Sequence, residues 1–196
     1  MRILRASTYR HMPWKNGGGE TTEIAVSPEG AGLDDFAWRI SMARVDGDGP
    51  FSAFAGVDRT LSILEGEGLR LEIAGRPAVT IGGDTAPFAF PADEKTDSVL
   101  LGAAVTDLNV MTRRISHAHT VRRLDVAVEA DIGSNADTVI LFCHRGSASL
   151  SANGLTEELG PLDTAILKDP AEIRLRADTA ASFFLVEIAA AKPDVS

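Results

Sequence analysis

Hydrophobic and polar residues alternate along much of the chain, which is the pattern of β-strands that bury one face. In the run FAWRISMARV, a period of two places Trp38 and Ile40 on one face and Arg39 and Ser41 on the other. The run RTLSILEGEGLRLEIAG is typical of a hairpin, because two alternating stretches flank a turn that contains glycines. The pattern therefore predicts strands joined by tight turns.

The rest of the chain offers further strands and no convincing helix. Gly, Pro, Asn and Asp interrupt the apolar runs about every 8 to 12 residues, as in a sandwich or barrel. The nearest candidate for a helix, EKTDSVLLGAA, has apolar residues that are too contiguous to form one stripe. We expect an all-β fold, whose further strands are PFAFPA, SVLLGAAV, TDLNVMTRR, DTVILFCHRGSASLSANG, LDTAILKD, AEIRLRA and ASFFLVEIA.

A weak internal repeat is visible when the chain is shifted by 79 positions. Aliphatic residues with strand spacing align by chance in many sequences, so the repeat alone leaves open whether two similar units exist. If the repeat is real, the junction lies near ISHAHTV, which is short and not rich in Gly or Ser, as in a tight crossover. The shift aligns the pairs Leu61–Ile140, Ile63–Phe142, Leu71–Leu150 and Gly75–Gly154.

Length and composition are typical of a cytoplasmic globular protein. With 196 residues, 44% of them hydrophobic, the chain suits one compact domain or two small ones that share a core. Its longest apolar runs are far short of the ~20 residues that a membrane helix needs, and its first residues lack a secretory signal. The single cysteine, Cys143, lies in an apolar run and is expected to be a buried, inert thiol.

Charge and motifs argue against several classes of site. The net charge of −9 and the pI near 4.9 disfavour nucleic acid as a partner, because phosphate binding needs a basic face. An acidic chain can still contain a local cationic site. His117 and His119 would form half of a metal site, but no third ligand follows at a useful spacing, and no G-x-S-x-G motif is present.

The stretch HMPWKNGGGETTEIAV gathers an aromatic residue, a cation, an amide and three glycines before a predicted strand. Consecutive glycines can bring backbone N–H groups close to a ligand, and Lys15 would add a positive charge. A phosphate-binding loop needs Gly-Lys-Ser/Thr before a helix, or the spaced glycines of a dinucleotide fold, so nucleotide binding is disfavoured. A bulge or tight turn at the entrance of the strand is the structural alternative.

Polar residues also share faces of predicted strands. In TDLNVMTRR, the residues Asp107, Asn109, Met111 and Arg113 lie on one face. If that face lines a barrel interior, its polar groups must satisfy one another or a ligand, because an unpaired buried donor costs ~1–3 kcal/mol. The alternative is that the same face is the solvent side of a half-exposed sheet.

The segment GPFSAFAGVDRTLSILEG adds Ser52 and Phe54, followed by the adjacent Asp58 and Arg59. Asp58 and Arg59 would form either a structural pair or an anion clamp. A guanidinium group presents a fork that suits two-point binding of a carboxylate.

Four motifs resemble the HutD/Ves family in their order and separation: MPWKNGGGETTEI, FAWRISMARV, DGPFSAFAGVDRTLSILEGEGLRL and TDLNVMTRR. The resemblance is dense up to about residue 115 and weaker beyond it. That family is associated with histidine utilisation operons and, in some relatives, with cold-induced expression. The resemblance implies a bicupin fold, with a cupin-like unit at residues 1–115 that carries the motifs and a second at residues 116–196.

The resemblance also implies a site without a metal or other cofactor. Ordinary cupins hold a metal through His-x-His plus Glu before the LEG hairpin and another His after it. The corresponding stretch here, FSAFAGVDRTLSILEG, contains no histidine. Metal-dependent dioxygenase or isomerase chemistry is therefore not expected.

The ligand that the resemblance implies is a small acid from histidine breakdown, such as N-formylglutamate or urocanate. Cations would offset its carboxylates, amides and hydroxyls would orient it, and apolar side chains would enclose its stem. Asp58 and Asp107 are expected to position arginines without touching the ligand. The expected ligand-binding residues are Trp14, Lys15, Asn16, Gly17, Gly18, Arg39, Ser41, Ser52, Phe54, Arg59, Asn109, Met111 and Arg113.

Two other functions stay open. A hydrolase or isomerase of a small acid would use Asp58 or Asp107 as a base, although a carboxylate beside arginines usually has a lowered pKa and is then a poor base near neutrality. A homodimeric interaction module without a ligand would bury the face that carries the motifs. A dimer formed through another surface is compatible with ligand binding.

Overall fold

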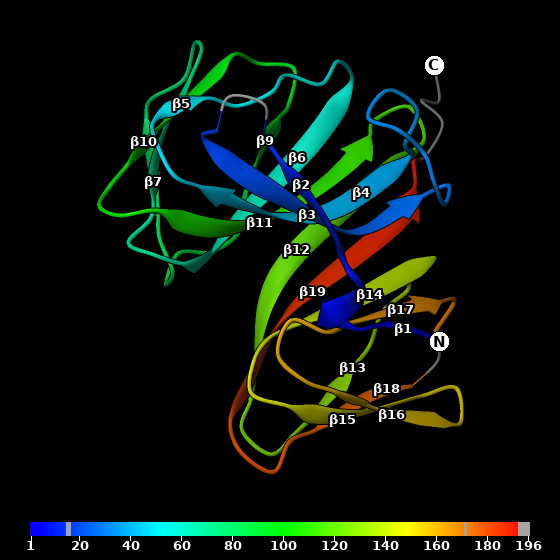
Figure 1. The fold of residues 1–196 in the computed structure, drawn as a ribbon. Helices are drawn as coiled ribbons and strands as arrows, with labels where there is room; N and C mark the ends of the chain where they lie inside the picture. The colour runs from blue at the N-terminus through cyan, green and yellow to red at the C-terminus, as the bar shows by residue number, and fades with distance from the viewer. Residues whose placement is uncertain (15–16, 171, 192–196) are drawn as a thin grey trace. The chain divides into compact units, whose positions relative to one another are not determined.

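The computed structural model describes residues 1–14, 17–170 and 172–191, and confirms the prediction of an all-β protein. In this part of the chain, the regular elements are strands apart from one short 3-10 helix, η1 (Ala6–Thr8), and no helix is both long and apolar enough to span a membrane. The chain divides into two compact units (Figure 1). We call Arg10–Ala118 the N-terminal unit, and Met1–Tyr9 together with His119–Ser196 the C-terminal unit.

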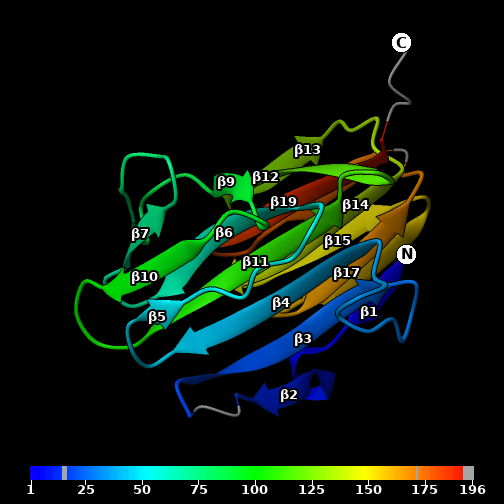
Figure 2. The same cartoon turned by 90° about the horizontal axis from the view of Figure 1, so that it is seen from above.

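The N-terminal unit consists of two antiparallel sheets with an apolar core between them. The larger sheet has the order β2-β3-β4-β11-β6-β9, which can be followed in Figure 2, and the smaller has the order β5-β10-β7-β8. Their strands are β2 (Arg10–Pro13), β3 (Gly19–Ser27), β4 (Trp38–Val45), β5 (Gly49–Pro50), β6 (Val57–Glu65), β7 (Leu69–Ile73), β8 (Val79–Ile81), β9 (Phe88–Pro91), β10 (Thr96–Leu100) and β11 (Val105–Arg113).

The C-terminal unit is built in the same way. Its sheets have the orders β1-β17-β14-β19-β12 and β13-β18-β15-β16. Their strands are β1 (Arg2–Leu4), β12 (His117–Val126), β13 (Glu129–Ile132), β14 (Thr138–Arg145), β15 (Ala148–Ala152), β16 (Leu155–Leu159), β17 (Thr164–Lys168), β18 (Ile173–Arg176) and β19 (Ala181–Ala190).

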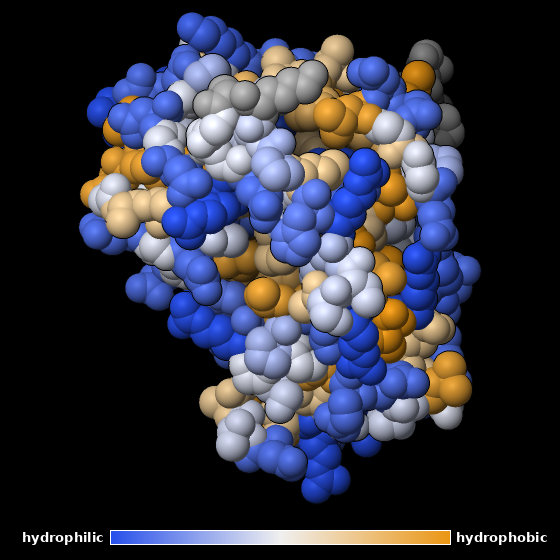
Figure 3. Space-filling model, viewed as in Figure 1, coloured by the Kyte–Doolittle hydropathy of each residue, from blue (hydrophilic) through white to orange (hydrophobic). Residues whose placement is uncertain are grey.

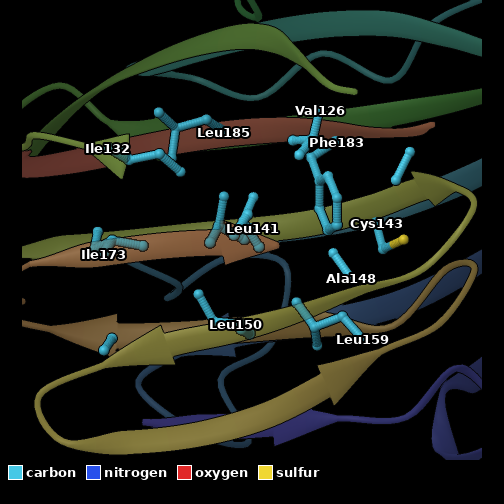
Figure 4. Packing of buried hydrophobic residues seen from close by; sticks show 14 of the residues in the cluster. Val126, Ile132, Leu141, Cys143, Ala148, Leu150, Leu159, Ile173, Phe183 and Leu185 are labelled. Carbon is cyan, nitrogen blue, oxygen red and sulfur yellow. The ribbon is translucent and has the colours of Figure 1, made fainter. Parts of the chain in front are cut away.

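Alternation along these strands fills the interior of the C-terminal unit with apolar side chains (Figure 4). Leu141 and Phe183 of the larger sheet pack with Leu150 and Leu159 of the smaller one, and all four are fully buried. Each such burial contributes about 1.5–3 kcal/mol. Cys143 lies in this core, where burial raises the pKa of its thiol to about 12, so the prediction of a buried thiol is confirmed.

The first nine residues belong to the C-terminal unit, whereas the sequence placed residues 1–115 in one unit. Strand β1 pairs with β17 and extends the larger sheet at its edge. Beyond β1, Arg5 donates to Asp163 at 2.8 Å, and the hydroxyl of Tyr9 donates to the carbonyl of Leu162 at 2.7 Å. A three-residue strand paired so far along the chain leaves no local sequence signal.

The two units share the order of four strands in their larger sheets, β4-β11-β6-β9 and β12-β19-β14-β17, and glycines at equivalent turns align them. Gly66 follows β6 and Gly146 follows β14. A Cβ atom on either glycine would meet a backbone carbonyl oxygen at 2.8 Å, that of Ala104 or Ala180, so neither position tolerates a larger residue. These glycines are 80 positions apart (146 − 66), one more than the predicted repeat.

The difference of one residue arises in the loop between the paired strands. The loop spans residues 66–68 in the N-terminal unit and only 146–147 in the C-terminal unit. Leu61 therefore corresponds to Leu141 and not to Ile140, because a slip of one residue moves a strand side chain to the other face. The predicted partner of Ile63 slips in the same way, while the pairs beyond the loop keep the predicted shift.

Large apolar side chains that remain exposed in the described chain come from separate segments, and in the view of Figure 3 hydrophilic residues lie among the apolar ones. Scattered apolar residues of this kind are normal on protein surfaces. The exposed residues are Leu33, Leu101, Ile115, Val128 and Leu155.

Tyr9→Phe should lower the free energy of unfolding by about 1–3 kcal/mol, because it leaves buried partners of the hydroxyl unsatisfied. The lost contacts are those to the carbonyl of Leu162 at 2.7 Å and the hydroxyl of Thr164 at 2.8 Å. Urea unfolding followed by circular dichroism measures the change. Thr8→Ala removes an exposed neighbouring hydroxyl and should have little effect. Equal stability of all three proteins would show that Tyr9 does not secure this segment.

Candidate functional site

One face of the larger sheet of the N-terminal unit points into the space between its two sheets. Val45 on β4 and Val105 on β11 lie opposite each other, and both belong to the apolar core. Because residues two apart on a strand share a face, Arg39 and Ser41 lie on the core side of β4. By the same rule, the core side of β11 carries Asp107, Asn109 and Met111, and that of β6 carries Arg59.

These polar residues are buried, which rules out the alternative that they form a solvent face. Arg39 is 5% exposed, Arg59 4% and Asp107 0%. Charged residues are rarely buried to this degree unless they are paired, coordinate a metal or serve a site. The cluster is therefore the candidate functional site of the protein.

Arg59 is held by an aromatic surround. Its Cζ lies 5.3 Å from the ring centroid of Phe51 and 5.4 Å from that of Phe54, distances typical of cation–π contacts. One terminal nitrogen donates to the carbonyl of Ser52 at 3.1 Å and contacts Sδ of Met111 at 3.7 Å. Within the described part of the chain, its Nε has no hydrogen-bond partner. The guanidinium is thus fixed in place, and its Nε–H is left without an acceptor in the described chain.

Arg39 is neutralised by a residue that the sequence analysis did not identify. Its Nε donates to Oε2 of Glu23 at 2.8 Å, and a terminal nitrogen contacts Oγ of Ser41 at 3.3 Å. Glu23 lies on β3 directly opposite Ser41. Period-two alternation in GETTEIAVS would have placed Glu23 on a defined face, but choosing the inner face required the pairing of β3 with β4.

Asp107 is fully buried and only half satisfied. Its Oδ1 accepts a hydrogen bond from Nδ2 of Asn109, whereas its Oδ2 has no partner among the described residues. Burial raises the pKa of Asp107 to about 7, although the charge of Arg59 and the backbone N–H of Ala43 oppose the rise. The expectation that a neighbouring arginine would lower the pKa of Asp107 is wrong, because desolvation is the larger effect.

Burial also acts on Arg59, in the direction that favours its neutral form. It lowers the pKa of Arg59 to about 10, while the negative charge of Asp107 raises it and the positive charge of Arg39 lowers it further. Arg59 therefore stays cationic near neutral pH. Its interaction with Asp107 shows that the two groups share one electrostatic environment.

The glycine-rich stretch forms a turn and a close strand contact. Nε1 of Trp14 donates to Oγ1 of Thr21 at 2.8 Å, and the half-buried ring packs against the core. The N–H of Gly17, which has a φ of +71°, donates to the carbonyl of Trp14 at 3.0 Å. A Cβ on Gly19 would lie 2.1 Å from the carbonyl oxygen of Arg44. The turn explains the glycine at position 17, and the close strand contact explains the glycine at position 19. The N–H of Gly17 already donates a hydrogen bond within the turn.

Arg113 holds a loop and does not join the cluster. Its Nε donates to the carbonyl of Phe36 at 2.9 Å, and a terminal nitrogen donates to the carbonyl of Asp34. The guanidinium also lies 5.3 Å from the ring centroid of Phe36. The sequence placed Arg113 correctly on the face of Met111, but could not show that a loop occupies its donors.

Asp58 lies on the opposite face of β6 from Arg59, so the two form neither a pair nor a clamp. Its Oδ1 accepts from Nε of Arg114 at 2.6 Å. Asp58 was expected to position an arginine of the binding site, but it instead contacts Arg114, which lies outside the predicted site. Only Asp107, of the two carboxylates predicted to support the site, lies within it.

The remaining predicted residues contribute little through their side chains or cannot be placed. Ser52 is exposed and offers its carbonyl to the cluster. Gly18 accepts a hydrogen bond from the N–H of Asp46 at 3.0 Å. Lys15 and Asn16 lie outside the described residues. The residues that the structure brings together as predicted are Arg39, Ser41, Phe54, Arg59, Asp107, Asn109 and Met111.

Aligned on the glycines that follow β6 and β14, the C-terminal unit has apolar residues at three positions where the N-terminal unit has polar ones, and Glu187 at the position of Met111. The counterparts of Arg59, Asp107 and Asn109 are, in that order, Val139, Phe183 and Leu185.

In residues 1–14, 17–170 and 172–191, no three His, Cys, Asp or Glu side chains gather in a way that could hold a metal ion. Nδ1 of His117 lies 2.9 Å from Oγ of Ser116. Metal-independent binding stays a prediction.

Comparison with known proteins identifies the family. The profile of the HutD family matches residues 6–185. An uncharacterized 21.2 kDa protein in the hutC 3′ region of Pseudomonas putida is 35% identical over 189 residues, which cover 96% of this chain and 97% of that protein. The chain belongs to the HutD family. The resemblance seen in the sequence is thus confirmed, and HutD proteins are associated with the histidine utilisation locus.

Solved structures support the fold of this HutD-family chain. The conserved protein of unknown function PA5104 from Pseudomonas aeruginosa PAO1 superposes with a TM-score of 0.90 at 36% identity, covering 96% of this chain and 98% of that one. Oxalate decarboxylase from Bacillus subtilis has a TM-score of 0.70 at 9% identity, covering 95% of this chain and 77% of that one. The second likeness concerns the fold alone and agrees with the predicted bicupin.

The buried carboxyl of Asp107 predicts a pH-dependent stability. Its pKa is about 7 in the folded state against 3.8 in an unfolded chain, so the folded protein holds a proton that the unfolded chain releases above about pH 4. The stabilisation from this proton is lost as the pH rises through 7. Between pH 5 and 8, wild type should lose on the order of 2–3 kcal/mol relative to Asp107→Asn, which does not titrate.

Denaturant unfolding at several pH values measures this difference. Asp58→Asn makes the same chemical change outside the cluster, and its stability should follow that of wild type across the range. If wild type and Asp107→Asn change in parallel with pH, Asp107 does not take up a proton on folding.

Proposed function

We propose that the N-terminal unit binds a small anionic metabolite of histidine degradation without a metal, and that the protein acts in histidine utilisation as a ligand-binding regulator or buffer. The observation that carries this proposal is a fully buried cluster with unused hydrogen-bonding capacity. Nε of Arg59 and Oδ2 of Asp107 are both buried, and neither has a partner in the described chain.

Burying these atoms without hydrogen-bond partners lowers the stability of the fold. An unsatisfied buried donor or acceptor destabilises a fold by about 1–3 kcal/mol, and more when the group is charged. A purely structural interior would replace these groups by apolar side chains, as the C-terminal unit does at the equivalent positions. The N-terminal unit keeps charged groups at two positions where the C-terminal unit has Val139 and Phe183, and this difference supports a binding role for the N-terminal unit.

The chemistry of the cluster favours a carboxylate. A guanidinium donates to carboxylate oxygens in a fixed direction, and Arg59 is already oriented by its aromatic surround and by the carbonyl of Ser52. Met111 is buried beside it, and Phe54 is half-buried, so an apolar stem would find contacts there. N-formylglutamate and urocanate combine a carboxylate with a short stem, and their origin in histidine degradation agrees with the family association.

A second candidate is an isomerase or hydrolase of the same small acid. It is favoured by the pKa of Asp107, which burial raises to about 7, near the value that suits a general base at neutral pH. Turnover of a candidate acid that Asp107→Asn abolishes, while binding is retained, would support this candidate over regulation or buffering.

Ligand binding should raise the thermal stability of the wild-type protein. A ligand at 100 times its Kd stabilises by about 2.7 kcal/mol, which corresponds to roughly 5–10 °C for a chain of this size. Differential scanning fluorimetry with N-formylglutamate, urocanate and glutamate measures the shift. If none of the three moves the melting temperature, the proposal fails.

Arg59→Lys is the variant that assigns the shift to this site. It keeps the charge beside Asp107 but replaces the directed guanidinium by a compact ammonium, so the affinity for the active ligand should fall about tenfold or more. Arg70→Lys makes the same change at an exposed position of β7 and should bind as wild type does. Equal affinity of both variants would place the ligand elsewhere.

A further inference from the structure

The two unfilled atoms of the cluster are of opposite kinds. Nε of Arg59 carries a proton and can only donate, whereas Oδ2 of Asp107 can only accept above the pKa of about 7 at which this carboxyl ionises. Arg59 is 4% exposed and Asp107 0%, so bulk water does not readily serve either. A ligand that satisfies both atoms has an acceptor for Nε of Arg59 and a donor for Oδ2 of Asp107.

The register places both atoms in one region of the interior. Arg59 lies opposite Met111, and Asp107 lies two positions beyond Asn109 on the same strand, so the row of Asn109 and Leu61 separates them. Both side chains are on the core face, and the charge of Arg59 acts directly on Asp107. A ligand that reaches Arg59 from the interior therefore lies on the same face as Asp107, with the row of Asn109 and Leu61 between the two groups.

Asn109 fixes which oxygen of Asp107 is left over. Its Nδ2 donates to Oδ1, which occupies one side of the carboxylate and leaves Oδ2 without a partner. Since Asn109 itself is 7% exposed, its amide has little freedom to rearrange. The acceptor offered to a ligand is thus held in position before the ligand arrives.

The charges of the cluster also favour a ligand that has a hydrogen-bond donor. Arg39 is paired with Glu23 at 2.8 Å, and the charge of Arg59 is offset by that of Asp107. With Asp107 ionised, these four side chains sum to zero, two positive and two negative. A ligand that brought only negative charge would leave Oδ2 unsatisfied and would be repelled by it.

We infer that the ligand presents an N–H or O–H donor to Asp107 in addition to the carboxylate it presents to Arg59, and that Asp107 selects for that donor. This inference rests on the proposed function and narrows its ligand class to small acids with a hydrogen-bond donor a few bonds from the carboxylate. Asp107 is then a specificity-determining residue. It discriminates because an acid of the same shape without the donor leaves a buried carboxylate oxygen unpaired.

A matched pair of probes tests the inference on the wild-type protein. N-formylglutamate carries an amide N–H, and 2-(formyloxy)pentanedioate is the ester in which oxygen replaces that N–H. Isothermal titration calorimetry at pH 8 should show the ester binding at least about tenfold more weakly than the amide. Equal affinity of the two probes would overturn the inference while leaving carboxylate binding intact.

Asp107→Asn assigns the discrimination to its residue. The asparagine can turn its own N–H group toward the ester oxygens, so the preference for the amide should shrink to less than about threefold. Asp58→Asn, the same change on the outer face of β6, should keep the wild-type preference. A preference that persists unchanged in Asp107→Asn would show that another group reads the donor.

The outcomes separate the two proposals. Failure of both probes to bind wild type removes the proposed function and this inference with it, whereas equal binding removes this inference alone. Circular dichroism and thermal melting establish that each variant is folded. If Asp107→Asn does not fold, the comparison of amide and ester on wild type still decides whether the site requires a donor.

Discussion

The N-terminal unit buries the charged groups of Arg59 and Asp107, and the contacts around them offset the free energy lost when these groups leave water. Burial shifts the pKa of each group toward its neutral form, and only the attraction between them and a few directed contacts oppose that shift. Aromatic rings and the carbonyl of Ser52 hold the guanidinium, and Asn109 holds one oxygen of the carboxylate. These contacts leave Nε of Arg59 and Oδ2 of Asp107 without partners in the described chain, and a ligand can supply those partners.

The interior of the C-terminal unit can be compared directly with this arrangement in the N-terminal unit. Both units are built from two sheets that share the order of their central strands, yet the interior of the C-terminal unit is filled by apolar packing. Phe183 stands where the N-terminal unit has Asp107, and Val139 stands where it has Arg59. A packed apolar core adds stability without directing any polar group, whereas the N-terminal unit gives up some of that stability for an oriented set of charges. The N-terminal unit thus buries charged residues at positions where the C-terminal unit has an apolar interior.

The sequence predicted the strands well because alternation is a local property, and it placed Asp107 and Asn109 on one face for the same reason. Whether that face was interior depended on the second sheet, which no local pattern reveals. Glu23 escaped notice because its role depends on which strand pairs with β4, and Asp58 was misjudged because adjacent strand residues point apart. Arg113 was predicted in the site because a strand pattern does not show which loop will use its donors. The family motifs pointed to residues that lie together in the interior, whereas the partners of each residue required the register.

The central claim is that this buried cluster is where a small acid binds. A crystal structure of the protein grown with N-formylglutamate tests it most directly. Electron density for a carboxylate within hydrogen-bonding distance of Nε of Arg59, with Arg39 still paired to Glu23, is the result predicted. Density for the ligand at another surface, with the interior between the two sheets unchanged, would contradict the account.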